Sequence, residues 1–197
     1  MFHEIPATIR RRMEVLEGVD ARDRRDLTAP RAGRLRQITP ETGRFLAILA
    51  ASAPEGRWVE IGTSAGYSAL WLALACREMG RKLTTFEIQP AKATLARETF
   101  REAGVEDVVE LIEGNALERV ASIEGIGYCF LDLEKEAYRA CYEAVVPRMV
   151  RGGLLAADNV VSHADALRAF VQAVEADTRA DSVVVPIGKG VLVCRKR

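Results

Sequence analysis

The sequence predicts a single α/β domain, in which helices cover both faces of a doubly wound, mostly parallel sheet. Three observations predict this fold class. From residue 57 onward, short apolar segments alternate with longer segments of helical periodicity. Glycines such as Gly80 and Gly104 follow the helical segments, as they do at helix ends. Only the last two strand segments have no helix between them, so one of that pair must run antiparallel to its neighbour.

The length and composition are those of an ordinary globular domain. The 197 residues are enough for one core and indicate no second folded domain. Lys and Arg balance Asp and Glu at 28 each, so the net charge gives no general attraction to nucleic acid or membranes. No apolar run reaches the roughly 18 residues that a membrane span needs, and the first residues do not resemble a signal peptide. We therefore expect a soluble, cytoplasmic protein.

The cysteines stand in apolar segments and form no C-x-x-C pair. This pattern indicates buried, reduced thiols and argues against a zinc site. The residues concerned are Cys76, Cys129, Cys141 and Cys194.

The first 37 residues are charged and irregular compared with the rest of the chain. A short helix is expected over 9–16, where apolar residues fall on one face. Segment 20–36 is dense in Arg and Asp and contains proline and glycine, so we expect an arm or lid outside the core. The predicted organisation is therefore an arm or lid over 1–37 and one domain over 38–197.

The domain begins with a helix that starts at Thr39-Pro40-Glu41, a helix cap followed by proline and an acid in the first turn. Further helices are expected at 67–79, 90–103, 116–123, 136–150 and 164–178. Strands are expected at 57–62, 83–87, 108–113, 128–133 and 154–158, followed by a hairpin of 182–186 and 190–194.

The loop after the first strand is the first candidate for ligand binding. Gly62 and Gly66 flank a short turn into the next helix, and glycine lets the backbone pass close to a ligand. The amide groups at the start of that helix are free to bind an anion. The spacing G-x-x-x-G differs from the G-x-G-x-x-G of dinucleotide folds, so NAD fits poorly. The alternative for this loop alone is a tight turn without a ligand.

Two more polar residues end the second and third strands. Glu87 stands where an acid can accept both hydroxyls of an adenosine ribose. Asn115 follows the third strand and offers an amide where an adenine ring would lie. Each alone is explained as an exposed residue at a strand end. Three such features at three successive strand ends favour an adenosyl ligand.

Oxygen ligands follow the fourth and fifth strands, at Asp132 and at Asp158-Asn159. Adjacent parallel strands would bring them to one edge of the sheet, and such oxygens suit Mg²⁺, Mn²⁺ or Ca²⁺. The alternative is that they only cap strands and open turns. Lys135 lies three residues past Asp132. A cation beside it would disfavour its ammonium form, as a catalytic base requires, whereas the alternative is an ion pair with a neighbouring glutamate.

These segments resemble the cation-dependent class I O-methyltransferases, the family of the catechol and caffeoyl-CoA O-methyltransferases with its small bacterial members. The resemblance covers roughly 38–197. The segments that carry it are E-I-G-T-S-A-G-Y-S at 60–68, F-E-I-Q-P at 86–90, G-N-A at 114–116, D-L-E-K-E-A-Y at 132–138, G-G-L-L-A-A-D-N at 152–159 and V-P-I-G-K-G at 185–190.

The resemblance implies S-adenosylmethionine as methyl donor, a sheet of seven strands with the last antiparallel, and often a homodimer. It implies Glu87 on the ribose, Ile88 beneath the adenine, and Lys135 as the base. The residues expected at the methionine part of the donor are Gly62, Ser64, Tyr67 and Ser68. The remaining expected donor contacts are Glu60, Gly66, Asn115, Ala116 and Asp132. The expected ligands of the divalent cation are Asp132, Asp158 and Asn159.

The chain departs from the family pattern at two places. Leu133-Glu134 replaces the residues that many bacterial relatives carry between the aspartate and the lysine, and the charge of the second is kept. The segment after Asn159 is shorter than the substrate loop of many relatives. This shortness indicates an acceptor site that is open, or one completed by residues 1–37 or by a partner chain. His163 lies in that segment and is a weaker candidate for an acceptor contact.

The predicted function is methyl transfer from S-adenosylmethionine to a hydroxyl of a small catechol-like or phenolic acceptor, with help from a divalent cation. One alternative is methylation of a hydroxylated uridine in tRNA, with the Arg-rich stretch 22–36 against phosphates. Another is a protein that binds S-adenosylmethionine without catalysis.

Overall fold

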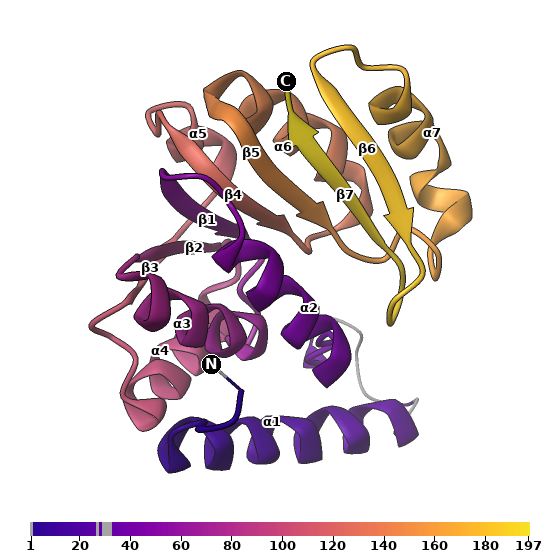
Figure 1. The fold of residues 1–197 in the computed structure, drawn as a ribbon. Helices are drawn as coiled ribbons and strands as arrows, with labels where there is room; N and C mark the ends of the chain where they lie inside the picture. The colour runs from indigo at the N-terminus through magenta and orange to yellow at the C-terminus, as the bar shows by residue number, and fades with distance from the viewer. Residues whose placement is uncertain (1, 27, 29–32) are drawn as a thin grey trace.

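The predicted α/β sheet is present in the computed structural model, which describes residues 2–26, 28 and 33–197 (Figure 1). Seven strands form one sheet in the order β3-β2-β1-β4-β5-β7-β6. They are β1 (Arg57–Ile61), β2 (Leu83–Glu87), β3 (Val109–Glu113), β4 (Ile126–Leu131), β5 (Met149–Ala157), β6 (Ala180–Val185) and β7 (Val191–Lys196). The first five strands pair in parallel, and β7 is antiparallel to both of its neighbours. The fold class and the antiparallel last strand are therefore confirmed.

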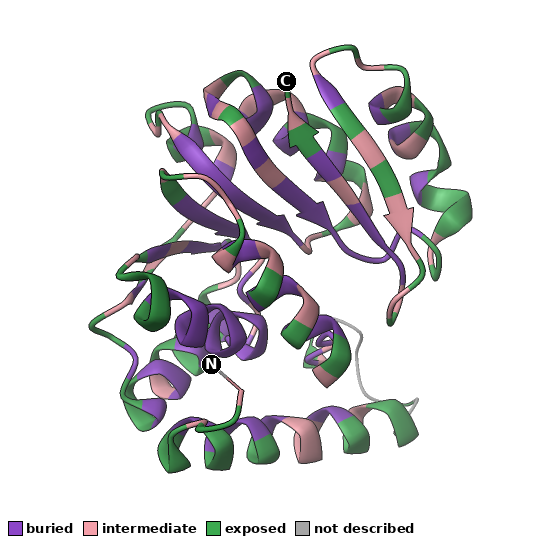
Figure 2. Cartoon of the chain, viewed as in Figure 1, coloured by how far each residue is buried: buried purple, intermediate pink, exposed green. Residues whose placement is uncertain are grey.

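Helices cover both faces of this sheet. They are α1 (Ala7–Arg25), α2 (Pro40–Ala51), α3 (Tyr67–Met79), α4 (Pro90–Ala103), α5 (Ala116–Val120), α6 (Tyr138–Val145) and α7 (Ala164–Glu175), with short 3-10 turns at Lys135–Ala137 and Val146–Arg148. One core cluster contains residues of α1, α2, α3 and α4 together with one face of the sheet. A second cluster contains residues of α5, α6 and α7 together with the other face. Figure 2 shows the central strands buried between these two layers. Within the described residues, no helix is long and apolar enough to span a membrane.

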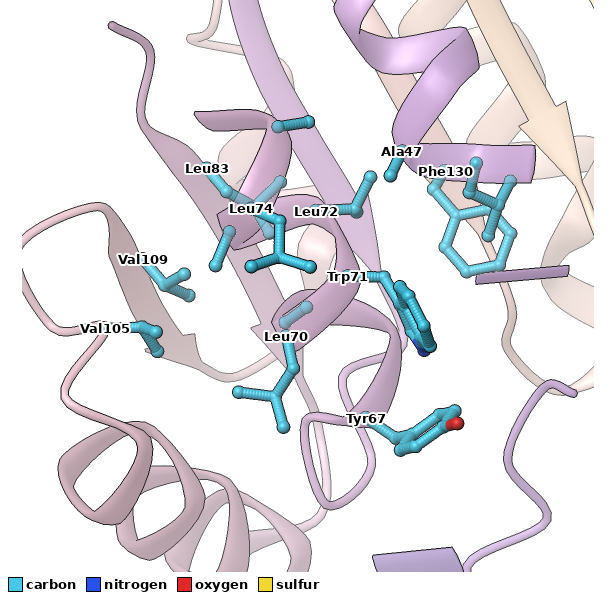
Figure 3. Packing of buried hydrophobic residues seen from close by; sticks show 14 of the residues in the cluster. Ala47, Tyr67, Leu70, Trp71, Leu72, Leu74, Leu83, Val105, Val109 and Phe130 are labelled. Carbon is cyan, nitrogen blue, oxygen red and sulfur yellow. The ribbon is translucent and has the colours of Figure 1, made fainter. Parts of the chain in front are cut away.

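Helix α3 forms the centre of the first core (Figure 3). Its residues are buried on every side through its first three turns because α3 packs between α2 and the sheet. Close packing explains Gly43 of α2, where any side chain would collide with the ring of Trp71. The loop that precedes α3 therefore leads into a closely packed helix.

The N-terminal segment differs from the prediction. The helix expected over 9–16 is the 19-residue helix α1, which packs against α4. Ion pairs support this helix, from Arg24 to Asp20 on its own surface and from Arg12 to Glu102 of α4. Leu35 belongs to the core cluster, so the expectation that 20–36 lies outside the core is wrong there. Residues 27 and 29–32 of the predicted arm lie outside the described residues, and movement of the arm stays a prediction.

The helix predicted over 136–150 is also shorter. Helix α6 ends at Val145, and the 3-10 turn that follows contains Pro147, which has no amide hydrogen to continue an α-helix. Met149 begins β5 and pairs with Ile126 of β4. The long fifth strand thus places Asp158 and Asn159 at the same sheet edge as the end of β4.

Candidate functional site

A cavity of about 630 Å³ lies beyond the carboxyl ends of the parallel strands. This is the edge at which doubly wound sheets bind ligands, because the loops that follow neighbouring strands meet there. Most of the predicted site residues line the cavity, namely Gly62, Ser64, Glu87, Ile88, Asn115, Ala116, Asp132, Lys135 and Asn159. The sequence prediction therefore identified a set of residues that the fold brings together.

The loop between β1 and α3 forms one wall of the cavity. Gly62 has a φ of +102°, and a side chain there would collide with the main-chain oxygen of Asp132. Glycine is thus required by both the backbone conformation and the close approach of the next strand. The Ser64 amide donates to Glu87 Oε2 at 2.7 Å, and its hydroxyl donates to the carbonyl of Leu35 at 3.1 Å. The loop is held in place from two sides.

Glu87 is held by backbone amides at the end of β2. Its Oε1 accepts from the Gln89 amide at 2.9 Å, while Oε2 accepts from Ser64. A carboxylate has about four acceptor positions, so two backbone bonds leave capacity for a ligand in the cavity. The residue is only 6% exposed, which places a fixed acceptor at the cavity wall.

Beside Glu87 the cavity wall is apolar. Ile88 is 64% exposed although it is a large hydrophobic residue, and it lines the cavity with Ala116 and Leu133. Such a surface suits the flat face of an aromatic ring, because covering it removes apolar area from water. Asn115 caps α5, where its side-chain oxygen accepts from the Leu117 amide at 3.1 Å. The cap uses the side-chain oxygen of Asn115, which also lines the cavity.

The residues after β4 and β5 meet as predicted. Asn159 Nδ2 donates to Asp132 Oδ1 at 2.7 Å and to the Tyr138 hydroxyl at 3.3 Å. The Tyr138 hydroxyl in turn donates to the main-chain oxygen of Asp158 at 3.1 Å. In this arrangement the nitrogen of the Asn159 amide lies beside Asp132. A half-turn of the amide group would put its oxygen there instead, as a shared cation would require. These contacts bring the Asp132 carboxylate and the Asn159 amide together and tie them to the main chain of Asp158.

The environment of the Asp158 carboxylate fits a bound cation. It is fully buried, and neither carboxylate oxygen has a hydrogen-bond partner among the described residues. Burial raises the pKa of Asp158 to about 7, and the charge of Asp132 adds to this effect. A buried carboxylate without partners is costly, and binding a cation is one of the ways by which proteins compensate for it. The described residues contain no cluster of three His, Cys, Asp or Glu side chains, so a cation here would rely on two carboxylates and Asn159.

Lys135 lies directly beside this group. Its Nζ donates to the Leu133 carbonyl at 3.0 Å and lies 5.1 Å from the centre of the Tyr138 ring. Burial lowers the pKa of Lys135, although the charges of Asp132 and Asp158 oppose the shift. For the alternative, an ion pair of Lys135 with Glu134 or Glu136, the structure shows Glu134 paired with Arg36. An amine with a lowered pKa thus faces the cavity.

Four of the predicted donor contacts do not line this cavity. Tyr67 and Ser68 line a smaller neighbouring space of about 20 Å³, and the Tyr67 hydroxyl donates to Glu17 of α1 at 2.6 Å. Gly66 lies against the ring of Phe100. Glu60 is fully buried beneath the loop, where it accepts from Ser68 and Thr85. Direct contact of Glu60 with the donor stays a prediction, and in the structure its carboxylate binds the side chains of the loop.

The buried Glu60 makes stability depend on pH. Burial raises its pKa from 4.5 to about 7, despite the hydrogen bonds from Ser68 and Thr85. The folded protein therefore binds more protons than the unfolded chain between these values, and stability falls as pH rises through that window. When the pH is raised from 5 to 8, we expect the Tm of Glu60→Gln to fall less than the Tm of the unmodified protein, as measured by thermal denaturation. Equal losses would contradict this assignment, and Glu110→Gln on the surface of β3 is the matched control.

A strap of residues 35–37, which the sequence did not predict, lies at one side of the cavity. Lys189 Nζ donates to the carbonyls of Arg36 and Gln37 at 2.9 and 3.1 Å, and Ser64 holds the carbonyl of Leu35. Lys189 stands in the V-P-I-G-K-G segment, so the resemblance pointed to it without giving it a role. His163 also lines the cavity, as its weaker prediction allowed.

Comparison with known proteins agrees with this geometry. A family model described as O-methyltransferase matches residues 19–197. The catechol O-methyltransferase of Mycobacterium tuberculosis is 35% identical over 126 residues, which are 63% of this chain and 57% of that protein. The caffeoyl-CoA O-methyltransferase 2 of Populus trichocarpa is 29% identical over 197 residues, which are 87% of this chain and 79% of that protein. The chain spans 57% and 58% of the length of the catechol O-methyltransferases from Mycobacterium tuberculosis and Niastella koreensis.

Solved structures share the fold over nearly the whole chain. The S-adenosylhomocysteine-bound methyltransferase PaMTH1 of Podospora anserina has a TM-score of 0.81 at 24% identity, covering 98% of this chain and 89% of that one. The cofactor-bound protein Rv0187 from MTB has a TM-score of 0.78 at 26% identity, covering 94% and 89%. The predicted resemblance is therefore confirmed by sequence and by fold.

Proposed function

The chain belongs to the O-methyltransferase family, and we propose that it transfers a methyl group from S-adenosylmethionine to a hydroxyl oxygen of a small catechol-like or phenolic acceptor. One observation carries the proposal: Glu87 and Ile88 share a single cavity with Asp132, Lys135 and Asn159. The first pair suits an adenosyl group, and the second set suits an acceptor hydroxyl.

The donor half of the proposed site has a fixed acceptor and an apolar surface. Two backbone amides orient Glu87, so its remaining lone pairs are preorganised to accept hydrogen bonds from a ribose. Ile88 offers its exposed side chain to the adenine ring. Preorganised contacts of this kind reduce the entropy that binding costs.

The acceptor half would hold a divalent cation through Asp132, Asp158 and Asn159. A cation bound there would supply a Lewis acid that binds acceptor oxygens and acidifies the reacting hydroxyl. The observation that supports this is the buried carboxylate of Asp158, which has no hydrogen-bond partner among the described residues. Hard oxygen ligands favour Mg²⁺, with Mn²⁺ or Ca²⁺ as alternatives.

Lys135 is proposed to take the proton from the acceptor hydroxyl. The resulting oxyanion then forms a bond to the methyl carbon as the bond from that carbon to sulfur breaks, and S-adenosylhomocysteine leaves. The amine is held at the cavity by Leu133 and by the Tyr138 ring. Such positioning of the reacting groups contributes much of the rate in transfers of this type.

The acceptor class is supported by the relatives, whose names specify catechol and caffeoyl-CoA. The tRNA alternative gains no support from the Arg-rich stretch, because Arg24 pairs with Asp20 and Arg36 pairs with Glu134. The expected homodimer and cytoplasmic location stay predictions.

A methyl-transfer assay tests the proposal. The purified chain is given S-adenosylmethionine with catechol, a dihydroxycinnamoyl thioester or tRNA, with Mg²⁺ or with EDTA, and methylated products are measured by mass spectrometry. We expect methylation of a vicinal diol with Mg²⁺ and a loss of about 100-fold or more in EDTA, as for removal of a catalytic cation. Methylation of tRNA alone would overturn the acceptor class, and binding of S-adenosylmethionine without any product would overturn catalysis.

A further inference from the structure

Lys92 is a lysine on the buried face of a helix. It stands in the first turn of α4 and is only 6% exposed. Ala96, Phe100 and Ala103 continue the same buried face toward the end of the helix. Lysine is rarely so buried unless its amine has a partner, and the sequence P-A-K-A gave no hint that this residue faces inward.

Lys92 lines the cavity without a hydrogen-bond or ion-pair partner in the described part of the chain. The other two lysines that line the cavity are occupied: Lys135 donates to the Leu133 carbonyl, and Lys189 donates to carbonyls of the strap. Lys92 therefore retains three donor positions that a ligand in the cavity can fill.

The charges around Lys92 limit what that ligand group is. Burial and the nearby charge of Arg36 lower the pKa of Lys92, while Glu87, Glu134 and Asp132 raise it. Three carboxylates therefore act on Lys92 from within this cavity. An anionic ligand group would be repelled by the carboxylates, whereas a neutral oxygen acceptor would not be.

A ribose hydroxyl has the matching chemistry. Its hydrogen can be donated to Glu87, which only accepts, and its oxygen then still has lone pairs to fill. The ammonium group of lysine has three donor hydrogens and no acceptor. Lys92 follows Glu87 by five residues, and Glu87, Ile88 and Lys92 line the same cavity.

We propose that Lys92 is a further binding residue for the adenosyl ligand, donating a hydrogen bond to a ribose hydroxyl oxygen whose hydrogen goes to Glu87. This inference rests on the proposed function, because it takes S-adenosylmethionine and its product to be the ligands of this cavity. It adds a donor to the ribose contacts, where the sequence predicted only an acceptor.

Calorimetry on the full chain tests this assignment without any methyl transfer. The dissociation constant of S-adenosylhomocysteine is measured for the unmodified protein, for Lys92→Met and for Lys82→Met, an exposed lysine before β2. We expect Lys92→Met to weaken binding about tenfold, the value of one hydrogen bond from a charged donor, and Lys82→Met to leave it unchanged. Lys92→Leu provides a second apolar variant should methionine disturb the packing of α4.

Analogues of S-adenosylhomocysteine that lack the 2′ or the 3′ hydroxyl identify the contact. The unmodified protein and Lys92→Met should bind one of the two analogues equally well, because the hydroxyl that Lys92 contacts is missing. An unchanged dissociation constant in Lys92→Met overturns the inference, and so does an equal loss for the parent ligand and both analogues. Failure of the unmodified protein to bind S-adenosylhomocysteine would instead count against the proposed function itself.

Discussion

Replacing Lys135 by methionine is expected to lower the turnover number of methyl transfer by about 100-fold to 10,000-fold, the range for a positioned general base. Methionine matches the lysine side chain as far as Cε, with sulfur in place of Cδ, and lacks the amine. The cavity residues that face the adenosyl group, Glu87 and Ile88, are untouched. The dissociation constant of S-adenosylhomocysteine should therefore stay within about twofold, measured by calorimetry beside the kinetics.

Lys135→Arg separates the base from the charge. Arginine keeps a positive group near Asp132 and Asp158 but does not lose its proton at any ordinary pH. If Lys135 takes a proton, Lys135→Arg should be nearly as slow as Lys135→Met. An arginine variant with most of the original turnover would instead assign Lys135 an electrostatic role, and full activity in Lys135→Met would remove it from the reaction.

The parallel part of the fold could be predicted from the sequence because its signals are local. The bounds of α3, α4 and β2 are those that apolar periodicity and a closing glycine indicated. The N-terminal segment could not be predicted in the same way. Its dense charges predicted an exposed arm. In the structure one of these charged residues, Arg12, instead pairs with Glu102, which lies 90 residues away in the sequence. Only the folded chain shows that α4 supplies that partner.

In the candidate site, too, local signals could be predicted and contacts between distant segments could not. Residues at strand ends, such as Glu87, Asp132 and Asn159, could be predicted because parallel strands bring their ends to one edge. The motif alone did not show that Glu60 is buried and accepts hydrogen bonds from Ser68 and Thr85. Lys92 was missed because a lysine after the start of a helix ordinarily faces water, and its burial depends on how α4 packs on the sheet.

Replacing Asp158 by asparagine is expected to weaken binding of Mg²⁺ at least tenfold and to lower methyl transfer about 100-fold or more. The change removes the charge and keeps the shape of a fully buried side chain. Binding of Mg²⁺ is followed by calorimetry, and the dissociation constant of S-adenosylhomocysteine should not change. Asp165→Asn at the start of α7 is the matched control, because that side chain is 96% exposed and pairs only with Arg168 within the described residues.

The same substitution separates a functional carboxylate from a structural one by the sign of its effect on stability. In EDTA, Asp158 carries the cost of a buried carboxylate without hydrogen-bond partners among the described residues. Asparagine removes that cost, so Asp158→Asn should melt at a higher temperature than the unmodified protein, by about 2 to 4 °C for each kcal/mol regained.

Mg²⁺ should then raise the Tm of the unmodified protein more than that of the variant, because only a site that binds the cation is stabilised by it. A variant that melts lower in EDTA and retains its Mg²⁺ response would show that Asp158 supports the fold, and the cation site would have to lie elsewhere. A residue that costs stability when alone and is needed for turnover is one that the chain keeps for its chemistry.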